Sequence, residues 1–175
     1  QITYHNNHAE EDWTVTLLET GMQSMTGGRL LRAMKHIGDE DVLLTYGDGV
    51  SDSNIAESVR FHYEQKALVT MTAVRPAGRF GELGIDQDTI SSFNEKPDQE
   101  AGYINGGYMV IDKSVREYLS GDDCVFEREP LEKLAATGRL KAFCHDGFWQ
   151  CMDTYREFEM LNKMWDSGKA PWKVW

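Results

Sequence analysis

Apolar residues recur along the chain at the two spacings that separate helices from strands. Leu30, Met34 and Ile37 follow one another at helical spacing, with Thr26 before them where its side chain can cap a helix. Asp52 or Ser53 is placed to open a second helix. Short apolar and β-branched runs predict strands instead. The expected strands are 13–18, 41–46, 67–74, 89–93, 107–111 and 140–145, and the expected helices are 26–37, 52–63, 113–119, 127–137 and 154–167.

The order of these elements predicts the fold class. Strand, helix, strand, helix and strand alternate through the first half, which favours a parallel sheet covered by helices. The run 41–46 is apolar enough to predict a strand buried on both faces. In the second half short strands follow a glycine-rich stretch, 78–84. We therefore predict one α/β domain over residues 1–175, with a Rossmann-like, mixed but mainly parallel sheet flanked by helices.

Composition excludes several classes of function. The 175 residues are 41% hydrophobic, which supports a packed core, and the formal net charge is −11. This charge argues against partners that are nucleic acids or anionic membrane surfaces. Three irregularly spaced cysteines predict no disulfide framework and favour a reducing, cytoplasmic setting. No apolar run is long enough to cross a bilayer, and the polar start suggests a cut inside a longer chain.

Two aspartates are the candidate metal ligands. Asp48 lies between Gly47 and Gly49 directly after a buried strand, where open α/β sheets bind ligands and where glycine allows close approach. Asp153 lies just before a helical pattern. Each has a simpler interpretation, Asp48 as a turn residue and Asp153 as a helix cap. Together, the two carboxylates could share one Mg²⁺.

Further polar segments suit a phosphorylated sugar. Lys96 could hold a phosphate and Glu95 could accept hydrogen bonds from sugar hydroxyls, unless the pair is an ordinary charged turn. Asn105 and Gly106 offer an amide and bare backbone, unless they form a hairpin turn. The segment Thr26-Gly27-Gly28-Arg29 stands at a helix N-terminus, where free N–H groups favour anions.

The histidines carry less weight. His5 and His8 are close in sequence but have no evident third ligand, and His36 and His62 fit surface or packing positions on helices. His145 could line the site. Its neighbour Cys144 is no catalytic partner, since adjacent strand residues face opposite ways.

Seven motifs in order resemble those of the sugar-1-phosphate nucleotidyltransferases. They are Thr26-Gly27-Gly28-Arg29-Leu30, Thr45-Tyr46-Gly47-Asp48-Gly49-Val50, Gly78-Arg79-Phe80-Gly81, Asn94-Glu95-Lys96-Pro97, Asn105-Gly106-Gly107, Gly147-Phe148-Trp149-Gln150 and Met152-Asp153-Thr154. The tail Gly168-Lys169-Ala170-Pro171-Trp172-Lys173 is similar to that of the glucose-1-phosphate cytidylyltransferases. The resemblance implies a nucleotide-diphospho-sugar transferase fold. It also implies transfer of a nucleotidyl group from a nucleoside triphosphate, here CTP, to glucose 1-phosphate.

The resemblance also implies residue roles. Asp48 and Asp153 match the family's Mg²⁺ ligands and act in catalysis with Lys96, which matches the lysine on the sugar phosphate. Glu95 matches the residue on the sugar hydroxyls.

The remaining matches concern the nucleotide and the sugar. Asn105 and Gly106 match sugar contacts, and 26–29 match the segment beside the nucleotide. Tyr46 and Trp149 would line the pocket, with Gly47 beside them, while Arg79 has no assigned contact.

One family motif has no counterpart in the 175 residues. The glycine-rich loop G-G-x-G-T-R, which wraps the triphosphate in the family, does not occur, so we expect an N-terminally truncated domain that does not catalyse the reaction alone. Exposed sheet edges should then favour a homo-oligomer. Three alternatives remain. They are thymidylyl or uridylyl transfer, a sugar-nucleotide-binding module without turnover, and a glycosyltransferase with a metal-binding Asp-x-Asp. For the last, Asp48 and Asp52 stand four positions apart instead of two.

Overall fold

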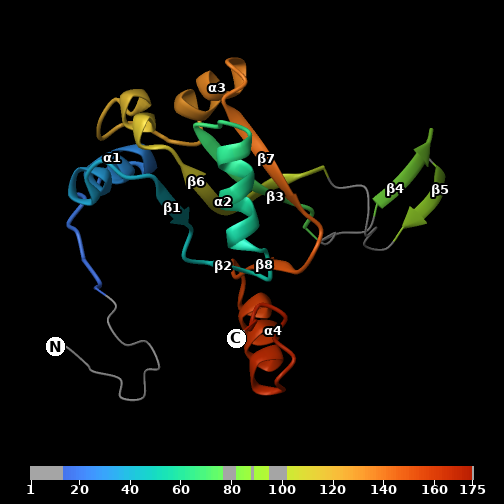
Figure 1. The fold of residues 1–175 in the computed structure, drawn as a ribbon. Coiled ribbons are helices and arrows are strands. Elements are labelled where there is room, and N and C mark those ends of the chain that lie inside the picture. The colour runs from blue at the N-terminus through green and yellow to red at the C-terminus, as the bar shows by residue number, and fades with distance from the viewer. Residues whose placement is uncertain (1–13, 77–81, 88, 95–101, 175) are drawn as a thin grey trace.

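The computed structural model describes residues 14–76, 82–87, 89–94 and 102–174 (Figure 1). The elements are α1 (Thr26–Ile37), β1 (Val42–Thr45), β2 (Gly49–Ser51), α2 (Ile55–Glu64), β3 (Val69–Val74), β4 (Glu82–Asp86), β5 (Thr89–Asn94), β6 (Ile104–Ile111), the 3₁₀ helix η1 (Lys113–Tyr118), α3 (Glu129–Ala136), β7 (Leu140–His145), β8 (Trp149–Cys151) and α4 (Tyr155–Asp166). A four-stranded sheet has the order β1-β6-β3-β7, while β2 pairs with β8 and β4 with β5 in two separate ribbons.

The central sheet is mixed, as predicted. β1 and β3 both run antiparallel to β6, and β7 runs parallel to β3. Three of the four strands therefore point the same way and β6 opposes them, so that β3 and β7 are the one parallel pair of neighbours in this sheet.

Burial separates the middle of the sheet from its edge. In β3, five of six residues are buried, because β6 and β7 flank the strand and helices cover both of its faces. β1 is an edge strand of the described sheet, and the exposed fraction of Leu43 is 59%. The prediction that 41–46 is buried on both faces is therefore wrong. The expectation of an exposed apolar edge is confirmed.

Helices cover the two faces of the sheet differently. The main core joins α1, η1 and α3 to one face, through Met34, Val115 and Leu134 against Val69 and Ile111 among others. The next residue of β3, Thr70, faces the opposite way, toward α2.

On that second face a buried histidine fixes α2. His62 is 1% exposed, and its Nδ1 lies 2.9 Å from Thr70 Oγ1. Phe61 packs against Phe143 of β7, with ring centroids 5.8 Å apart. The packing role predicted for His62 is therefore confirmed.

The helix caps differ from those expected. Met25 is the N-cap of α1, so Thr26 is not, and α2 is capped by Asn54, whose side chain accepts the Glu57 N–H, instead of Asp52 or Ser53. Gly38 ends α1 with a φ of 89°, which glycine adopts readily. Thr154 caps α4 with Glu157 in a capping box, so Asp153 is not the cap.

The predicted strand at 13–18 is not formed in its described part, since residues 14–18 have no regular structure. Val15 and Leu17 are 75% and 92% exposed. A strand needs a partner for its backbone groups, and no described strand pairs with this segment. Conversely β2, β4 and β8 were missed; β2 and β8 have three residues each, too few to show a periodic pattern.

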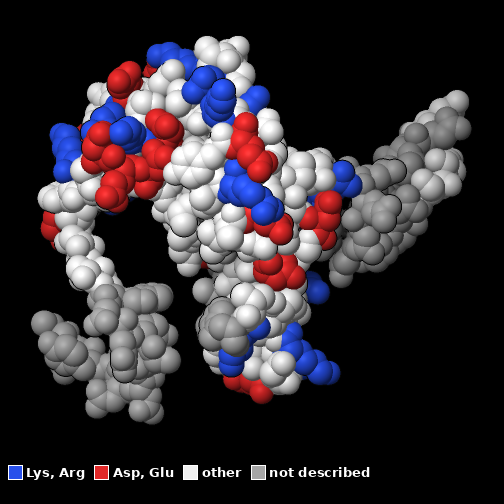
Figure 2. All heavy atoms as spheres, viewed as in Figure 1, with Lys and Arg blue, Asp and Glu red and all other residues white. Residues whose placement is uncertain are grey.

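The surface matches the composition. The face in Figure 2 shows acidic and basic side chains mixed around α1, without a continuous basic surface. Cys124, Cys144 and Cys151 form no disulfide bond with one another. Among the described residues, no helix combines the length and apolar character needed to span a membrane.

Candidate active site

A bulge in β6 forms the centre of the site. Met71 of β3 pairs with Met109 of β6, and Ala73 pairs with Asn105. Between these two pairs β3 has a single residue, whereas β6 has three. The additional β6 residues turn the backbone of Gly106 and Gly107 away from a regular ladder. The interpretation of this segment as a hairpin turn is therefore wrong, because it lies inside a strand.

Both glycines of the bulge are required by their surroundings. A Cβ on Gly106 would lie 2.9 Å from the carbonyl oxygen of Thr72. Gly107 has a φ of 80°, and a Cβ there would lie 3.2 Å from the Tyr46 ring. The Asn105 side chain accepts the Gly107 N–H at 2.9 Å, and the Gly107 carbonyl accepts the Tyr46 N–H at 2.9 Å. The bulge thus fixes Asn105 beside the end of β1.

Glu127 joins the predicted site residues and was not predicted. The Tyr46 hydroxyl donates to its Oε1, and Thr26 Oγ1 donates to its Oε2 at 2.6 Å. Asn105 Nδ2 also reaches the Tyr46 hydroxyl at 3.4 Å. Burial, followed by the hydrogen bond to Glu127, raises the pKa of Tyr46 well above its usual range. Glu127 lies 81 positions from Tyr46, so no local motif could have indicated it.

The start of α1 packs tightly against the loop before Glu127. A Cβ on Gly27 would lie 2.5 Å from Cys124 Sγ, and one on Gly28 would lie 2.8 Å from the Gly121 carbonyl oxygen. The Gly27 N–H donates to the Cys124 carbonyl at 2.8 Å, so it is not one of the free donors expected there. Both glycines therefore have a packing role that the motif alone did not show.

Arg29 contacts the preceding loop. Its Nε donates to the Ser24 carbonyl at 2.8 Å and its Nη1 to Thr20 Oγ1 at 3.0 Å. These bonds hold the exposed guanidinium against 20–24, next to the segment proposed to face the nucleotide.

The ribbon of β2 and β8 brings the two aspartates together. Gly49 pairs with Cys151, and the Met152 N–H donates to the Asp48 carbonyl at 2.7 Å. Asp153 is the next residue, so the backbones of two aspartates 105 positions apart in sequence lie at one end of the ribbon. Gly47 leaves space beside them, because a Cβ there would meet no atom within 4 Å.

Two side chains attach this ribbon to the bulge. Trp149 Nε1 donates to the Gly106 carbonyl at 2.8 Å, and the Tyr108 hydroxyl donates to the Gly49 carbonyl at 2.7 Å. The negative charge of Asp48 adds to burial in raising the pKa of Tyr108, and it contributes in the same direction at Tyr46. Asp48 is thus electrostatically coupled to both tyrosines.

Three side chains that could act as metal ligands lie close together at this end of the ribbon. Asp153 Oδ2 accepts from Cys151 Sγ at 3.2 Å, and single ligand atoms of Cys151, Asp153 and Glu157 lie within 4.8 Å of one another. Glu157 Oε2 also accepts the N–H groups of Asp153 and Thr154 at 2.9 and 2.8 Å. Carboxylate oxygens are the usual protein ligands of Mg²⁺, whereas the Cys151 thiol is a softer ligand. Asp48 is not part of this group, so a Mg²⁺ shared by Asp48 and Asp153 stays a prediction.

The ring of His145 contacts the Asp52 carboxylate and the Phe148 carbonyl beside the ribbon. His145 Nε2 lies 2.9 Å from Asp52 Oδ1, and the side chains are 13% and 31% exposed. A Cβ on Gly147 would lie 2.6 Å from that same oxygen, so a larger residue there would displace the Asp52 and His145 side chains. His145 therefore contacts Asp52, the residue that follows β2, while Asn54 caps α2.

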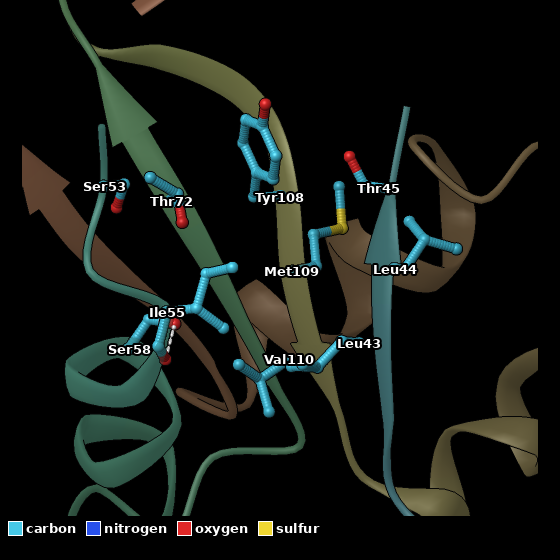
Figure 3. A pocket seen from close by; sticks show the side chains of 10 residues that line it. All are labelled: Leu43, Leu44, Thr45, Ser53, Ile55, Ser58, Thr72, Tyr108, Met109 and Val110. Carbon is cyan, nitrogen blue, oxygen red and sulfur yellow. Dashed lines mark hydrogen bonds between the residues drawn. The ribbon is translucent and has the colours of Figure 1, made fainter. Parts of the chain in front are cut away.

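A pocket of about 160 Å³ opens on the α2 face of the sheet (Figure 3). Thr45 and Tyr108 line it together with Leu43, Ile55 and Val110. The lining is mostly apolar. Thr45 and Tyr108, which stand next to Tyr46 and Gly107 in the sequence, form its polar end.

Several predicted residues lie outside the described part of the chain. These are Glu95, Lys96, Arg79, His5 and His8. The structure thus brings together Thr26, Tyr46, Asp48, Asn105, Gly106, Trp149 and Asp153, and their ligands remain predictions.

Comparison with known proteins shows the family of the chain. The family model described as Nucleotidyl transferase matches residues 5–163. Glucose-1-phosphate cytidylyltransferase from Salmonella typhi is 47% identical over 166 residues, 94% of this chain and 65% of the relative. A probable glucose-1-phosphate cytidylyltransferase from Bacillus subtilis is 42% identical over the same shares. The chain thus spans less than two thirds of the length of these relatives.

Solved structures show the same fold at low identity. HddC from Yersinia pseudotuberculosis, complexed with GMP-PN, matches with a TM-score of 0.63 and 24% identity, over 85% of this chain and 65% of that chain. A UDP-glucose pyrophosphorylase complexed with UDP-glucose matches with a TM-score of 0.61 and 16% identity, over 86% and 65%. From the family match and the identity to its relatives, the chain belongs to the nucleotidyl transferase family.

Proposed function

We propose that this chain carries the sugar-phosphate and metal-binding part of a sugar-1-phosphate nucleotidyltransferase, with CTP and glucose 1-phosphate as its substrates. The observation that carries the proposal is the hydrogen bond from the Met152 N–H to the Asp48 carbonyl, which places the backbones of two distant acidic motifs, at Asp48 and Asp153, next to each other. The 47% identity to the Salmonella typhi cytidylyltransferase supports the choice of CTP and glucose.

In this reaction a phosphate oxygen of the sugar 1-phosphate attacks the α-phosphorus of the nucleoside triphosphate. One P–O bond forms as the bond to pyrophosphate breaks, so the products are a nucleotide sugar and pyrophosphate. Asp48 and Asp153 would hold Mg²⁺, which when bound neutralises phosphate charge. Positioning and charge neutralisation supply most of the catalysis in phosphoryl chemistry.

The remaining side chains orient the substrates. Asn105 and the bare backbone of Gly106 face the sugar, and Lys96 and Glu95 are assigned to its phosphate and hydroxyls. Tyr46 and Trp149 form walls beside them, and the start of α1 faces the nucleotide. Because the motif G-G-x-G-T-R is not among the 175 residues, we expect this chain to bind product without turning over substrate.

Calorimetric titration of CDP-glucose into the 175-residue chain, with and without Mg²⁺, tests the proposal. We expect binding that depends on Mg²⁺ and that Asp48→Asn abolishes, while Asp123→Asn, outside the site, leaves it unchanged. Equal binding without the metal and in Asp48→Asn would instead support a binding module without metal chemistry. A parallel assay of pyrophosphate release with CTP, dTTP and UTP tests the base and the expected lack of turnover.

A further inference from the structure

One carboxylate connects three separate parts of the candidate site. Glu127 accepts from the Tyr46 hydroxyl at the end of β1 and from the Thr26 hydroxyl at the start of α1. Tyr46 is bonded in turn to the β6 bulge through the Gly107 carbonyl, at 2.9 Å, and receives Asn105 Nδ2 at 3.4 Å. The residues assigned to the nucleotide and those assigned to the sugar therefore share Glu127.

The fold near Glu127 is held by other contacts. Phe126 and Leu131, on the same segment, are 1% and 6% exposed in the main core. The N–H of Phe126 donates to Thr26 Oγ1 at 3.0 Å, and the Met25 and Gly27 N–H groups donate to carbonyls of 122 and 124 at 2.8 Å. These bonds attach α1 to the 122–126 loop without the Glu127 side chain, whose own contacts are with the Thr26 and Tyr46 hydroxyls.

The chemistry of a carboxylate suits this role. Two oxygens accept from two hydroxyls at once, and hydrogen bonds to a charged group are stronger than neutral ones. In glutamine an NH₂ donor replaces one of the two oxygens, so the two hydroxyls no longer face two separate acceptor atoms. The substitution Glu127→Gln keeps nearly the same shape and removes one of these bonds.

We propose that Glu127 is a positioning residue that holds the Tyr46 ring against the β6 bulge and thereby sets the spacing between the nucleotide and sugar sides of the site. The proposal rests on the proposed function. Glu127 acts through Tyr46, so the two substitutions should not have independent effects.

The first test reads the Tyr46 hydroxyl directly. Tyrosine carrying carbon-13 at Cζ is incorporated, and the Tyr46 signal among the seven tyrosines is assigned by its loss in Tyr46→Phe. We expect Glu127→Gln to shift this signal at neutral pH. The matched control Glu129→Gln, two positions away with an exposed carboxylate paired to Lys133, should leave it in place. An unshifted Tyr46 signal in Glu127→Gln overturns the proposal.

The second test is a double-mutant cycle on CDP-glucose binding. Glu127→Gln and Tyr46→Phe should each weaken binding about tenfold, and the double variant should bind no more weakly than Tyr46→Phe alone. Additive losses, or unchanged affinity in Glu127→Gln, overturn the positioning role. If the unaltered chain binds no CDP-glucose, the proposed function fails, while the Cζ signal still decides whether Glu127 holds Tyr46.

Discussion

Acid should destabilise this protein through one buried histidine before its carboxylates protonate. His62 is 1% exposed on α2, and its Nδ1 lies 2.9 Å from Thr70 Oγ1. Burial lowers the pKa of His62 below 6.5, although the charges of Asp41 and Asp112 act weakly in the opposite direction. In the folded protein the imidazole therefore stays neutral at pH values where the unfolded chain is already protonated.

The sign and size of the effect follow from this difference. Because the unfolded chain binds the additional proton, stability contributed by neutral His62 is full above about pH 6.5 and falls as the pH drops toward the lower folded pKa. One proton gives a slope of at most about 1.4 kcal/mol per pH unit in this window. The carboxylates whose pKa is lowered, Asp39, Asp112 and Glu129, lose their contributions only at more acidic pH.

Urea unfolding followed by tryptophan fluorescence at pH 7.5, 6.5 and 5.5 measures this dependence. The control is His62→Gln, which cannot titrate and can still form a hydrogen bond to Thr70. We expect the free energy of unfolding to fall between pH 6.5 and 5.5 more steeply in the unaltered chain than in His62→Gln. Equal slopes in the two proteins would show that His62 is not the group responsible and would refute the reasoning.

Three further predictions concern the sheet and the ribbon. Gly106→Ala sets a Cβ 2.9 Å from a backbone oxygen and should cost about 1–3 kcal/mol in urea unfolding, whereas Gly47→Ala, with no atom within 4 Å, should cost far less. Trp149→Phe removes the 2.8 Å hydrogen bond to the Gly106 carbonyl, so the Met152 amide in the ribbon should exchange faster with deuterium. Unchanged exchange would contradict the attachment of the ribbon to the bulge through Trp149. Leu43→Lys on the exposed edge strand should reduce self-association measured by light scattering; an equal mass for both proteins would argue against association through β1.

Elements with a strong local pattern could be predicted from the sequence, because that pattern survives in the fold. β3 and β7 were placed within two residues of their observed bounds, and the helices at α1 and α4 within one. Apolar positions of α1 and β3 pack in the main core, so local preference and tertiary packing agree there, whereas α4 contributes none of the residues of that core. β1 was located correctly, but its burial was predicted wrongly. Burial depends on the neighbouring strands in the sheet, and a run of apolar residues does not specify them.

The candidate site was predictable only where a motif was continuous in sequence. Asp48 follows a strand directly, so the topology placed it at the sheet edge. Glu127 stands at a position that sequence assigned to an ordinary helix start, and its two partners lie 81 and 101 positions away. Gly27 and Gly28 were assigned to ligand approach, but their neighbours show that close packing against the 121–124 loop also requires them.

The bulge in β6 explains why these distant residues meet at one place. In a regular antiparallel ladder, the carbonyls of Gly106 and Gly107 would bond to neighbouring strands at fixed intervals. Here the Gly106 carbonyl accepts the Trp149 indole and the Gly107 carbonyl accepts the Tyr46 N–H, so one irregularity connects β8 and β1 to the same turn of backbone. The ribbon that carries Asp48 and the tyrosine held by Glu127 are both positioned from it. The spacing between the predicted metal ligands and the predicted sugar contacts therefore depends on the β6 backbone, which sets the positions of the side chains around it.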